Sequence, residues 1–245
     1  MTARATLATA RRVLWQIRHD PRTIALLLGV PTILMWLFKL VLEDREATFQ
    51  FIGIPLLGLF PMISMFLVTS ITMLRERGSG TLERLMTMPI SKLDVLAGYG
   101  LAFGLLAVIQ GAFVSAVGFG LLGLEANHPV LIVITLAVLN ALLGMALGLA
   151  LSALARTEFQ AVQLMPAVIF PQLLLCGLFV DRSEMSRALE AISAVLPMTY
   201  AYDALDRVAT SPELGSEVVR DVVVLIAVML LALGLGALTL RRRTP

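Results

Sequence analysis

The chain has 245 residues, of which 58% are hydrophobic and only 15% are charged, and its mean hydropathy is +0.90. Soluble globular domains are usually ~45–50% apolar and ~25% charged, so this composition excludes a purely soluble domain. The net charge of +2 is too small to indicate a nucleic-acid partner, and a single cysteine, Cys176, excludes an intrachain disulfide. The length suits one bundle of several membrane spans, because each span needs ~20 residues.

The N-terminal tail, residues 1–22, has the pattern of an amphipathic helix. Four aliphatic residues share one face, with Trp15 at its edge: Leu7, Val13, Leu14 and Ile17. The arginines are expected to face water and lipid headgroups: Arg11, Arg12 and Arg18. Asp20 and Pro21 suit the N-cap and first position of a new helix. We therefore expect an elbow helix that lies on the cytoplasmic surface and turns into the first span. A disordered basic tail is the alternative.

Six apolar segments are long enough to cross a bilayer. They are residues 24–42, 52–74, 95–124, 130–155, 161–180 and 218–240. The first is too long for a signal peptide and is not followed by a small-x-small cleavage site, so we interpret it as a span. The expected fold class is all-α: a polytopic membrane protein with six transmembrane helices in one domain, residues 1–245.

The basic residues indicate the orientation of these spans. Six spans put both termini on one side, and that side holds 13 basic residues, against 5 on the other. The positive-inside rule then places both termini in the cytoplasm. Twelve of the 17 acidic residues lie on the outer side, which agrees with this layout, although acidic residues count little in the rule.

The loop 75–92 is the densest polar stretch on the inner side. The glycines in residues 78–80 should end the preceding helix, and residues 81–86 should form a short helix that stops near Pro89. Ser91 and Asp94 have the spacing of a capping box for the third span. The apolar face of the short helix needs the membrane or another protein to cover it: Leu82, Leu85 and Met86.

The outer segment, residues 181–217, is too polar to span but has helical periodicity. A first amphipathic helix carries Met185, Leu189, Ile192 and Leu196 and ends at Pro197, and a second covers residues 199–208. Two short helices between spans fit a re-entrant or interfacial hairpin. A soluble outer loop is the alternative.

Several kinds of chemistry are missing from the sequence. A P-loop needs a lysine directly after a glycine, but the lysines, Lys39 and Lys92, follow Phe38 and Ser91. Two histidines on opposite sides and one cysteine cannot form a tetrahedral metal site within one chain. No acidic residue falls in the middle of a span, where ion-coupled transporters usually need ionisable groups. We therefore expect no cofactor, no ATP site and no enzymatic activity in this chain, and a partner that supplies energy.

Polar residues inside the spans have two interpretations. The amides can join helices by hydrogen bonds or line a substrate path: Gln110, Asn140, Gln163 and Gln172. Lys39, near the end of the first span, is expected to snorkel to the outer interface or to hold an anionic headgroup. The small-xxx-small patterns 100–104 and 144–148 indicate close helix contacts within or between subunits. Two prolines should kink the fifth span, as a gate or as a static irregularity: Pro166 and Pro171.

Three stretches resemble the type-2 ABC transporter permease family. The first and most specific is Arg75-Glu76-Arg77-Gly78-Ser79-Gly80-Thr81-Leu82-Glu83-Arg84-Leu85, followed by Met88-Pro89-Ile90-Ser91. It departs from the family pattern by Arg75, where Glu is common, and by one extra residue in the glycine turn. The second comprises residues 176–180, 196–200 and 203–205, and the third is the turn 19–22. The chain looks most similar to the drug-resistance and nodulation-factor exporters.

The resemblance implies a single type-2 ABC transmembrane domain with an elbow helix (1–22), a coupling loop (75–92) and a re-entrant outer hairpin (181–217). It implies a dimer of permeases, as homodimer or heterodimer, with two ATP-binding subunits that carry ATP and Mg²⁺. The coupling helix would be Thr81, Leu82, Glu83, Arg84, Leu85 and Met86, and the outer gate Pro197 and Tyr200. Gln110, Asn140, Gln172 and Lys39 are candidates for a substrate path.

The function expected from this resemblance is export of an amphiphilic drug, lipid or lipid-linked glycan across a bacterial plasma membrane. The partners would be ATP-binding subunits, a second permease and membrane lipids, and no nucleic acid. An ion-coupled secondary transporter or channel without an ATPase is the alternative, and it should transport in liposomes without any ATPase.

Overall fold

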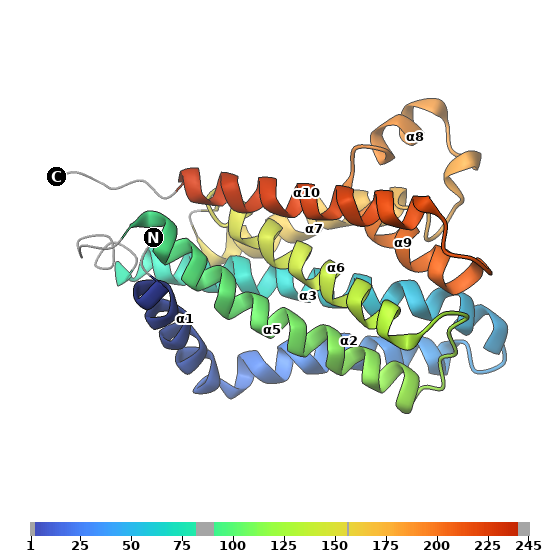
Figure 1. The fold of residues 1–245 in the computed structure, drawn as a ribbon, viewed down its shortest axis with the longest axis horizontal. Helices are drawn as coiled ribbons and strands as arrows, with labels where there is room; N and C mark the ends of the chain where they lie inside the picture. Colours follow the sequence, from blue (N-terminus) through green and yellow to red (C-terminus); the bar gives the residue numbers. More distant parts are fainter. Residues whose placement is uncertain (1–2, 82–90, 156, 240–245) are drawn as a thin grey trace.

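The computed structural model describes residues 3–81, 91–155 and 157–239. Helices make up nearly all of this part of the chain (Figure 1). In chain order they are α1 (Ala3–Arg18), α2 (Pro21–Val41), α3 (Glu46–Gly78), α5 (Lys92–Gly120), α6 (Val130–Leu151), α7 (Glu158–Leu175), a 3-10 turn (Arg182–Glu184), α8 (Arg187–Ser193), α9 (Pro197–Thr210) and α10 (Ser216–Thr239).

Six of these helices are long and apolar enough to cross a membrane: α2, α3, α5, α6, α7 and α10. The expected six-span, all-α architecture is confirmed. Some predicted boundaries were wrong. The fifth span ends at Leu175 and not at residue 180, since Gly177 takes a φ of +107° that a helix cannot continue. The second span has 33 residues, so it extends ~50 Å and protrudes beyond a hydrocarbon core of ~30 Å.

α3 and α6 form the centre of the bundle, and α2, α7 and α10 expose most of their surface around it. The two helices approach closely because Gly144 and Gly148 on α6 face the backbone of α3. A Cβ at Gly148 would lie 2.5 Å from the carbonyl oxygen of Phe66, and one at Gly144 would overlap the carbonyl of Met62. This small-xxx-small pattern therefore mediates a contact within the subunit.

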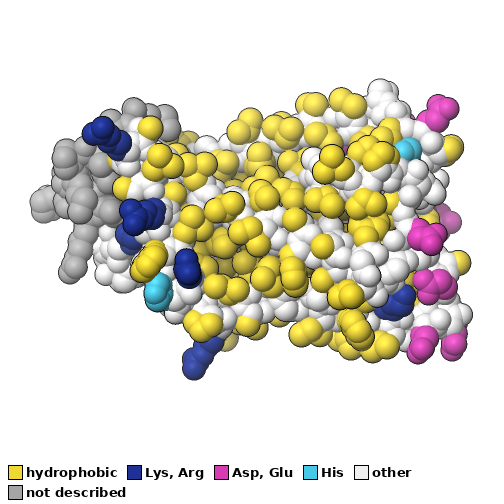
Figure 2. Space-filling model, turned by 60° about the horizontal axis from the view of Figure 1, so that its bottom comes forward, with side chains coloured by type: hydrophobic (Ala, Val, Ile, Leu, Met, Phe, Trp, Pro, Cys, Tyr) yellow, Lys and Arg dark blue, Asp and Glu magenta, His cyan; other side chains and the backbone are white. Residues whose placement is uncertain are grey.

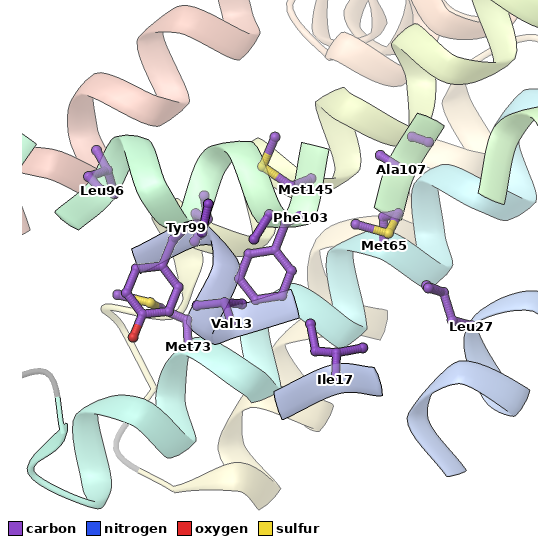
Figure 3. Close-up of a cluster of buried hydrophobic side chains, with 14 of the residues drawn as sticks. Val13, Ile17, Leu27, Met65, Met73, Leu96, Tyr99, Phe103, Ala107 and Met145 are labelled. Carbon is purple, nitrogen blue, oxygen red and sulfur yellow. The ribbon is translucent and has the colours of Figure 1, made fainter. Parts of the chain in front are cut away.

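α1 lies across one end of the bundle and packs mainly on α5 (Figure 1). Val13 and Ile17 of α1 form one buried cluster with Tyr99 and Phe103 of α5 and Met73 of α3 (Figure 3). The predicted N-terminal helix and its junction are confirmed. Asp20 caps α2 by accepting a hydrogen bond from the Thr23 N–H at 3.2 Å. The hydrogen bonds from the Thr23 hydroxyl and from this N–H lower the pKa of Asp20.

The predicted orientation of α1 needs two corrections. Val13 and Ile17 are buried as expected, but Leu7 lies outside, 62% exposed, and small residues take its place against the bundle: Thr6, Thr9 and Ala10. Arg12 does not face water but points into the bundle, where a buried carboxylate pairs with it. The hydrophobic periodicity of the sequence predicted the helix, but it could not predict that Glu76 of α3 pairs with Arg12.

The charges separate toward the two ends of the bundle, with an apolar band between them (Figure 2). We call the end with α1, the C-terminus of α3 and the N-termini of α5 and α7 the basic end. The opposite end, with α8, α9 and the loop 121–129, is the acidic end. At the acidic end the two predicted short helices are present. α9 is longer than expected and packs its buried face against α3, α6 and α10. That this hairpin re-enters the membrane stays a prediction.

Candidate functional site: polar networks at the two ends of the bundle

The segment between α3 and α5 is anchored at both of its ends. At the first, Ser79 donates its N–H to the Arg75 carbonyl at 2.9 Å, and Gly80 follows with a φ of +69°. At the second, the predicted capping box is confirmed: the Asp94 N–H donates to Ser91 Oγ (3.0 Å) and the Ser91 N–H to Asp94 Oδ2 (3.2 Å). A force applied to this segment would therefore reach both helices.

The predicted coupling helix falls largely outside the described residues. Of its members only Thr81 is described, with its hydroxyl 2.9 Å from Ser79 Oγ. The roles expected for the other five stay predictions: Leu82, Glu83, Arg84, Leu85 and Met86.

A buried polar network joins three helices next to this segment. The Glu76 carboxylate on α3 is 6% exposed, and it accepts hydrogen bonds from Tyr99 Oη on α5 (2.8 Å) and Arg12 Nη2 on α1 (3.2 Å). Arg12 also donates to the Tyr99 hydroxyl, and its guanidinium carbon lies 5.7 Å from the centre of that ring. A buried charge is costly unless it is paired. The pairing therefore fixes α1, α3 and α5 relative to one another.

Two further polar contacts act at the basic end. Thr6 of α1 donates its hydroxyl to Asp94 Oδ1 at 3.4 Å, so the α5 cap also contacts α1. Arg75 forms a two-pronged ion pair with Glu158 at the start of α7, at 2.9 and 3.0 Å. Both partners are more than half exposed, so this ion pair contributes only about 0.2–1 kcal/mol.

A cavity of about 350 Å³ lies at the basic end, between the α6–α7 connection and the first turns of α7. Two aliphatic and two amide side chains line it: Leu154, Leu164, Gln160 and Gln163. The lining named here therefore offers apolar surface and uncharged hydrogen-bonding groups, in a hollow that is largely open to the surface.

A second network crosses the acidic end. Arg182, which follows α7, donates to Asp203 of α9 at 2.9 Å. Arg207 of α9 lies 3.8 Å from Asp203 and 3.0 Å from Glu217, and it also pairs with the fully buried Asp221 of α10. These ion pairs connect the loop after α7 to α9, and α9 to α10.

Burial raises the pKa of Asp203 to about 6, against the opposing effect of Arg182 and Arg207. The ion pair between Arg182 and Asp203 consequently loses its carboxylate charge as the pH falls through about 6, while an exposed aspartate stays ionised there.

The residues proposed for the outer gate lie at the corner between α8 and α9. Pro197 is the first residue of α9, where its missing N–H costs no hydrogen bond. Tyr200 donates its hydroxyl to the carbonyl of Ala194, and Thr199 donates to that of Ser193, each at 2.7 Å. The corner is thus closed by two side chains of α9 that bind the C-terminal end of α8. The gating role itself stays a prediction.

Residues 4–208 match the family model for the ABC-2 type transporter. The chain belongs to this family. The match covers α1 to most of α9, including both polar networks except for the side chains of α10.

Several curated proteins are similar to this ABC-2 type chain. The probable multidrug ABC transporter permease YbhS of Escherichia coli K12 is 25% identical over 72% of this chain and 47% of its own length. The permease YbhR of the same organism is 24% identical, over 60% and 40%. ABC transporter G family member 20 of Dictyostelium discoideum is 28% identical, over 56% and 19%. The chain thus spans less than half the length of each of these relatives.

In this ABC-2 type bundle each of the three candidate path amides joins two helices. Gln110 Nε2 donates to the carbonyl of Leu27 (2.7 Å), which links α5 to α2, and Asn140 Nδ2 donates to that of Ala201 (3.1 Å), which links α6 to α9. Gln172 Oε1 accepts the N–H of Met198 at 3.4 Å, which links α7 to α9. All three amides are buried, so the geometry favours the helix-joining interpretation. Gln163, in contrast, lines the cavity of α7.

Lys39 lies at the acidic end, as the snorkelling interpretation expects, but it also has protein partners. Its ammonium group donates to the carbonyl of Leu122, lies 4.0 Å from Glu46 and is 5.3 Å from the centre of the Phe49 ring. These contacts hold the loop after α5 against α2 and α3. A role in a substrate path stays a prediction.

Sequence reasoning missed Arg12, Glu76 and Tyr99 as a unit. A signal was present, because only five acidic residues fall on the basic side. Each of the four that the structure describes makes a specific contact: Asp20 caps α2, Asp94 caps α5, Glu76 pairs with Arg12, and Glu158 pairs with Arg75. A rare acid among many arginines is a candidate for a structural ion pair.

Proposed function

We propose that this chain is the permease subunit of an ATP-driven ABC exporter for amphiphilic molecules: drugs, lipids or lipid-linked glycans. ATP and Mg²⁺ bind in a separate ATPase subunit, present in two copies, and a second permease completes the membrane domain. The complex lies in a bacterial plasma membrane, with the basic end and both termini in the cytoplasm. Family membership, six apolar spans and relatives with permease names support this proposal.

The anchored segment between α3 and α5 is the observation on which the mechanism depends. The ATPase contacts residues 81–86, with Leu82 and Leu85 as apolar anchors and Glu83 and Arg84 as charged contacts. Because Glu76 binds both Arg12 and Tyr99, a push on this segment moves α1, α3 and α5 together.

The acidic end responds through α3, which extends the length of the bundle and contacts α9. A shift of α3 strains the contacts of α9 with Arg182 and α10, and the corner at Pro197 and Tyr200 opens. The substrate enters beside α7, where the cavity with Gln160 and Gln163 combines apolar and amide surface.

Charge reversal in the coupling segment tests this function. We expect Glu83→Arg and Arg84→Glu to lower export of ethidium, an amphiphilic dye, at least tenfold, while the complex still inserts and hydrolyses ATP. The matched control is Glu213→Arg, an exposed residue at the acidic end, which should export normally. Unchanged export in both coupling variants would refute the assignment. Transport by the purified chain in liposomes, driven by an ion gradient and without ATPase, would favour the secondary transporter.

A further inference from the structure

The outward face of α1 carries a regular stripe of basic and apolar side chains. Its members alternate at steps of three or four residues, so they share one face of the helix: Arg4, Leu7, Arg11, Trp15 and Arg18. All five are exposed, Leu7 at 62% and Trp15 at 59%. The three arginines recur every seventh residue and extend over ~21 Å of helix.

Three contacts on the opposite face fix the rotation of α1, and so the direction of this stripe. Gly98 of α5 lies against the helix so closely that a Cβ there would be 2.5 Å from Thr9 Cβ and 2.9 Å from the Thr6 carbonyl oxygen. Arg12 pairs with Glu76 from the same direction. The stripe therefore cannot turn inward without breaking these contacts.

The stripe carries positive charge that its own helix cannot neutralise. α1 contains no acidic residue, and no ion pair joins Arg4, Arg11 or Arg18 to a carboxylate in the part of the chain that the structure describes. Lys and Arg side chains are prominent at this end of the molecule, with hydrophobic side chains among them (Figure 2).

Its position places the stripe at a membrane surface. Only two residues separate the end of α1 from Pro21, the first residue of the first span, so Arg18 lies at the level where the chain enters the bilayer. Tryptophan is enriched at that level, because its ring is apolar and its N–H is polar. The rings of Trp15 and His19 are in tilted contact, with their centroids 4.8 Å apart.

We propose that the stripe of α1 binds the headgroups of anionic phospholipids, with Leu7 and Trp15 inserted between the acyl chains. Arginine is suited to phosphate because its guanidinium group can donate two parallel hydrogen bonds. Three arginines in a row, separated by apolar residues, match a negatively charged lipid layer better than a protein surface, which would have to alternate carboxylates and apolar pockets at the same interval. The selectivity for anionic lipid does not depend on the proposed export.

The two tryptophans of the chain, Trp15 and Trp36, allow a direct test. In the Trp36→Phe variant, Trp15 is the only tryptophan, and brominated lipids quench its fluorescence on contact. We expect brominated phosphatidylglycerol to quench Trp15 at least threefold more than brominated phosphatidylcholine at equal, low mole fraction. The preference should disappear in 0.5 M salt, where the screening length falls to about 4–5 Å.

Two sets of variants serve as controls. Removal of the arginines (Arg4→Gln, Arg11→Gln, Arg18→Gln) should abolish the preference, and Arg45→Gln with Arg187→Gln, exposed residues at the acidic end, should retain it. If the triple variant does not fold, Arg11→Gln alone should reduce the preference. The Trp15→Phe variant, which reports Trp36 of α2, should show no preference.

Equal quenching by the two lipids, or a preference that survives loss of the arginines, would overturn the proposal. Quenching by neither lipid would mean that Trp15 does not contact the acyl chains, and would overturn it as well. The measurement needs neither ATP nor a transported substrate. The lipid proposal can therefore fail while the proposed export function stands, and the export function can fail while the lipid proposal stands.

Discussion

Glu76 is a buried acidic residue of the basic end that forms an ion pair next to the segment between α3 and α5. It lies two residues before the end of α3, where the chain leaves the span, and it binds one helix on each side through Arg12 and Tyr99. Its neighbour Arg75 points outward and makes an exposed ion pair with Glu158. Two adjacent charges of one motif therefore contribute very differently to stability.

The pair of variants Glu76→Gln and Arg75→Gln separates these contributions. We expect Glu76→Gln to lower the free energy of unfolding by about 1–3 kcal/mol, because Arg12 is left largely buried without a counter-charge. Arg75→Gln should lower it by less than about 1 kcal/mol, since its ion pair is exposed. Equilibrium unfolding of the purified chain in mixed detergent micelles measures both values. An equal loss in the two variants would contradict the burial argument.

At the scale of elements, glycine positions decide how closely helices approach. The pattern Gly100 to Gly104 was predicted as a contact within or between subunits. Within the subunit, a Cβ at Gly100 would meet nothing within 4 Å, and one at Gly104 would touch only Leu142 at 3.6 Å, so only a contact between subunits stays a prediction. A tight position of α5 is Gly98, which faces the backbone of α1, whereas Gly111 and Gly118 are tight against other helices of the bundle. A small-residue spacing identifies one helix face, but it does not identify the partner helix or the distance.

Alanine at Gly98 and at Gly100 should therefore change stability in opposite directions. Gly98→Ala places a methyl group against a backbone carbonyl that cannot move alone, so we expect a loss of about 1–3 kcal/mol and a looser α1. Gly100→Ala meets open space and removes a flexible residue from a helix, so it should gain up to about 1 kcal/mol. The same unfolding experiment measures both. Two losses of similar size would show that α5 tolerates no methyl group on either face, contrary to the structure.

The elements themselves were largely predictable, and their polar contacts were not. The lengths of the apolar segments predicted six spans. Asp20 followed by Pro21 predicted the start of α2, and Ser91 with Asp94 predicted the capping box. These predictions succeeded because each signal is local in sequence. The hydrogen bonds of Arg12 with Glu76, of Lys39 with Leu122 and of Asn140 with Ala201 join residues between 61 and 83 positions apart. Such contacts depend on how helices pack, and a single sequence contains no direct signal for packing.

For the whole molecule, the separation of charge between the ends predicts its orientation in the membrane. The acidic end holds the exposed Glu213 and Glu217, and the basic end holds the arginines of α1. Figure 2 shows Asp and Glu side chains toward one end of the molecule and Lys and Arg side chains mostly toward the other. Arginine and lysine are retained on the cytoplasmic side of spans. An inverted chain would place the stripe of α1 and the anchored segment outside, where no ATPase could reach them.

Single cysteines at the two ends test this orientation. Cys176 is buried, so Cys176→Ser provides a background in which Ser79→Cys marks the basic end and Glu213→Cys marks the acidic end; both positions are exposed. We expect a membrane-impermeant maleimide to label residue 213 in intact cells, and to label residue 79 only after the membrane is permeabilised. Labelling of residue 79 from outside would place the segment between α3 and α5 in the wrong compartment. No cytoplasmic ATPase could then act on it, and the polar network of Glu76 would have to serve another purpose.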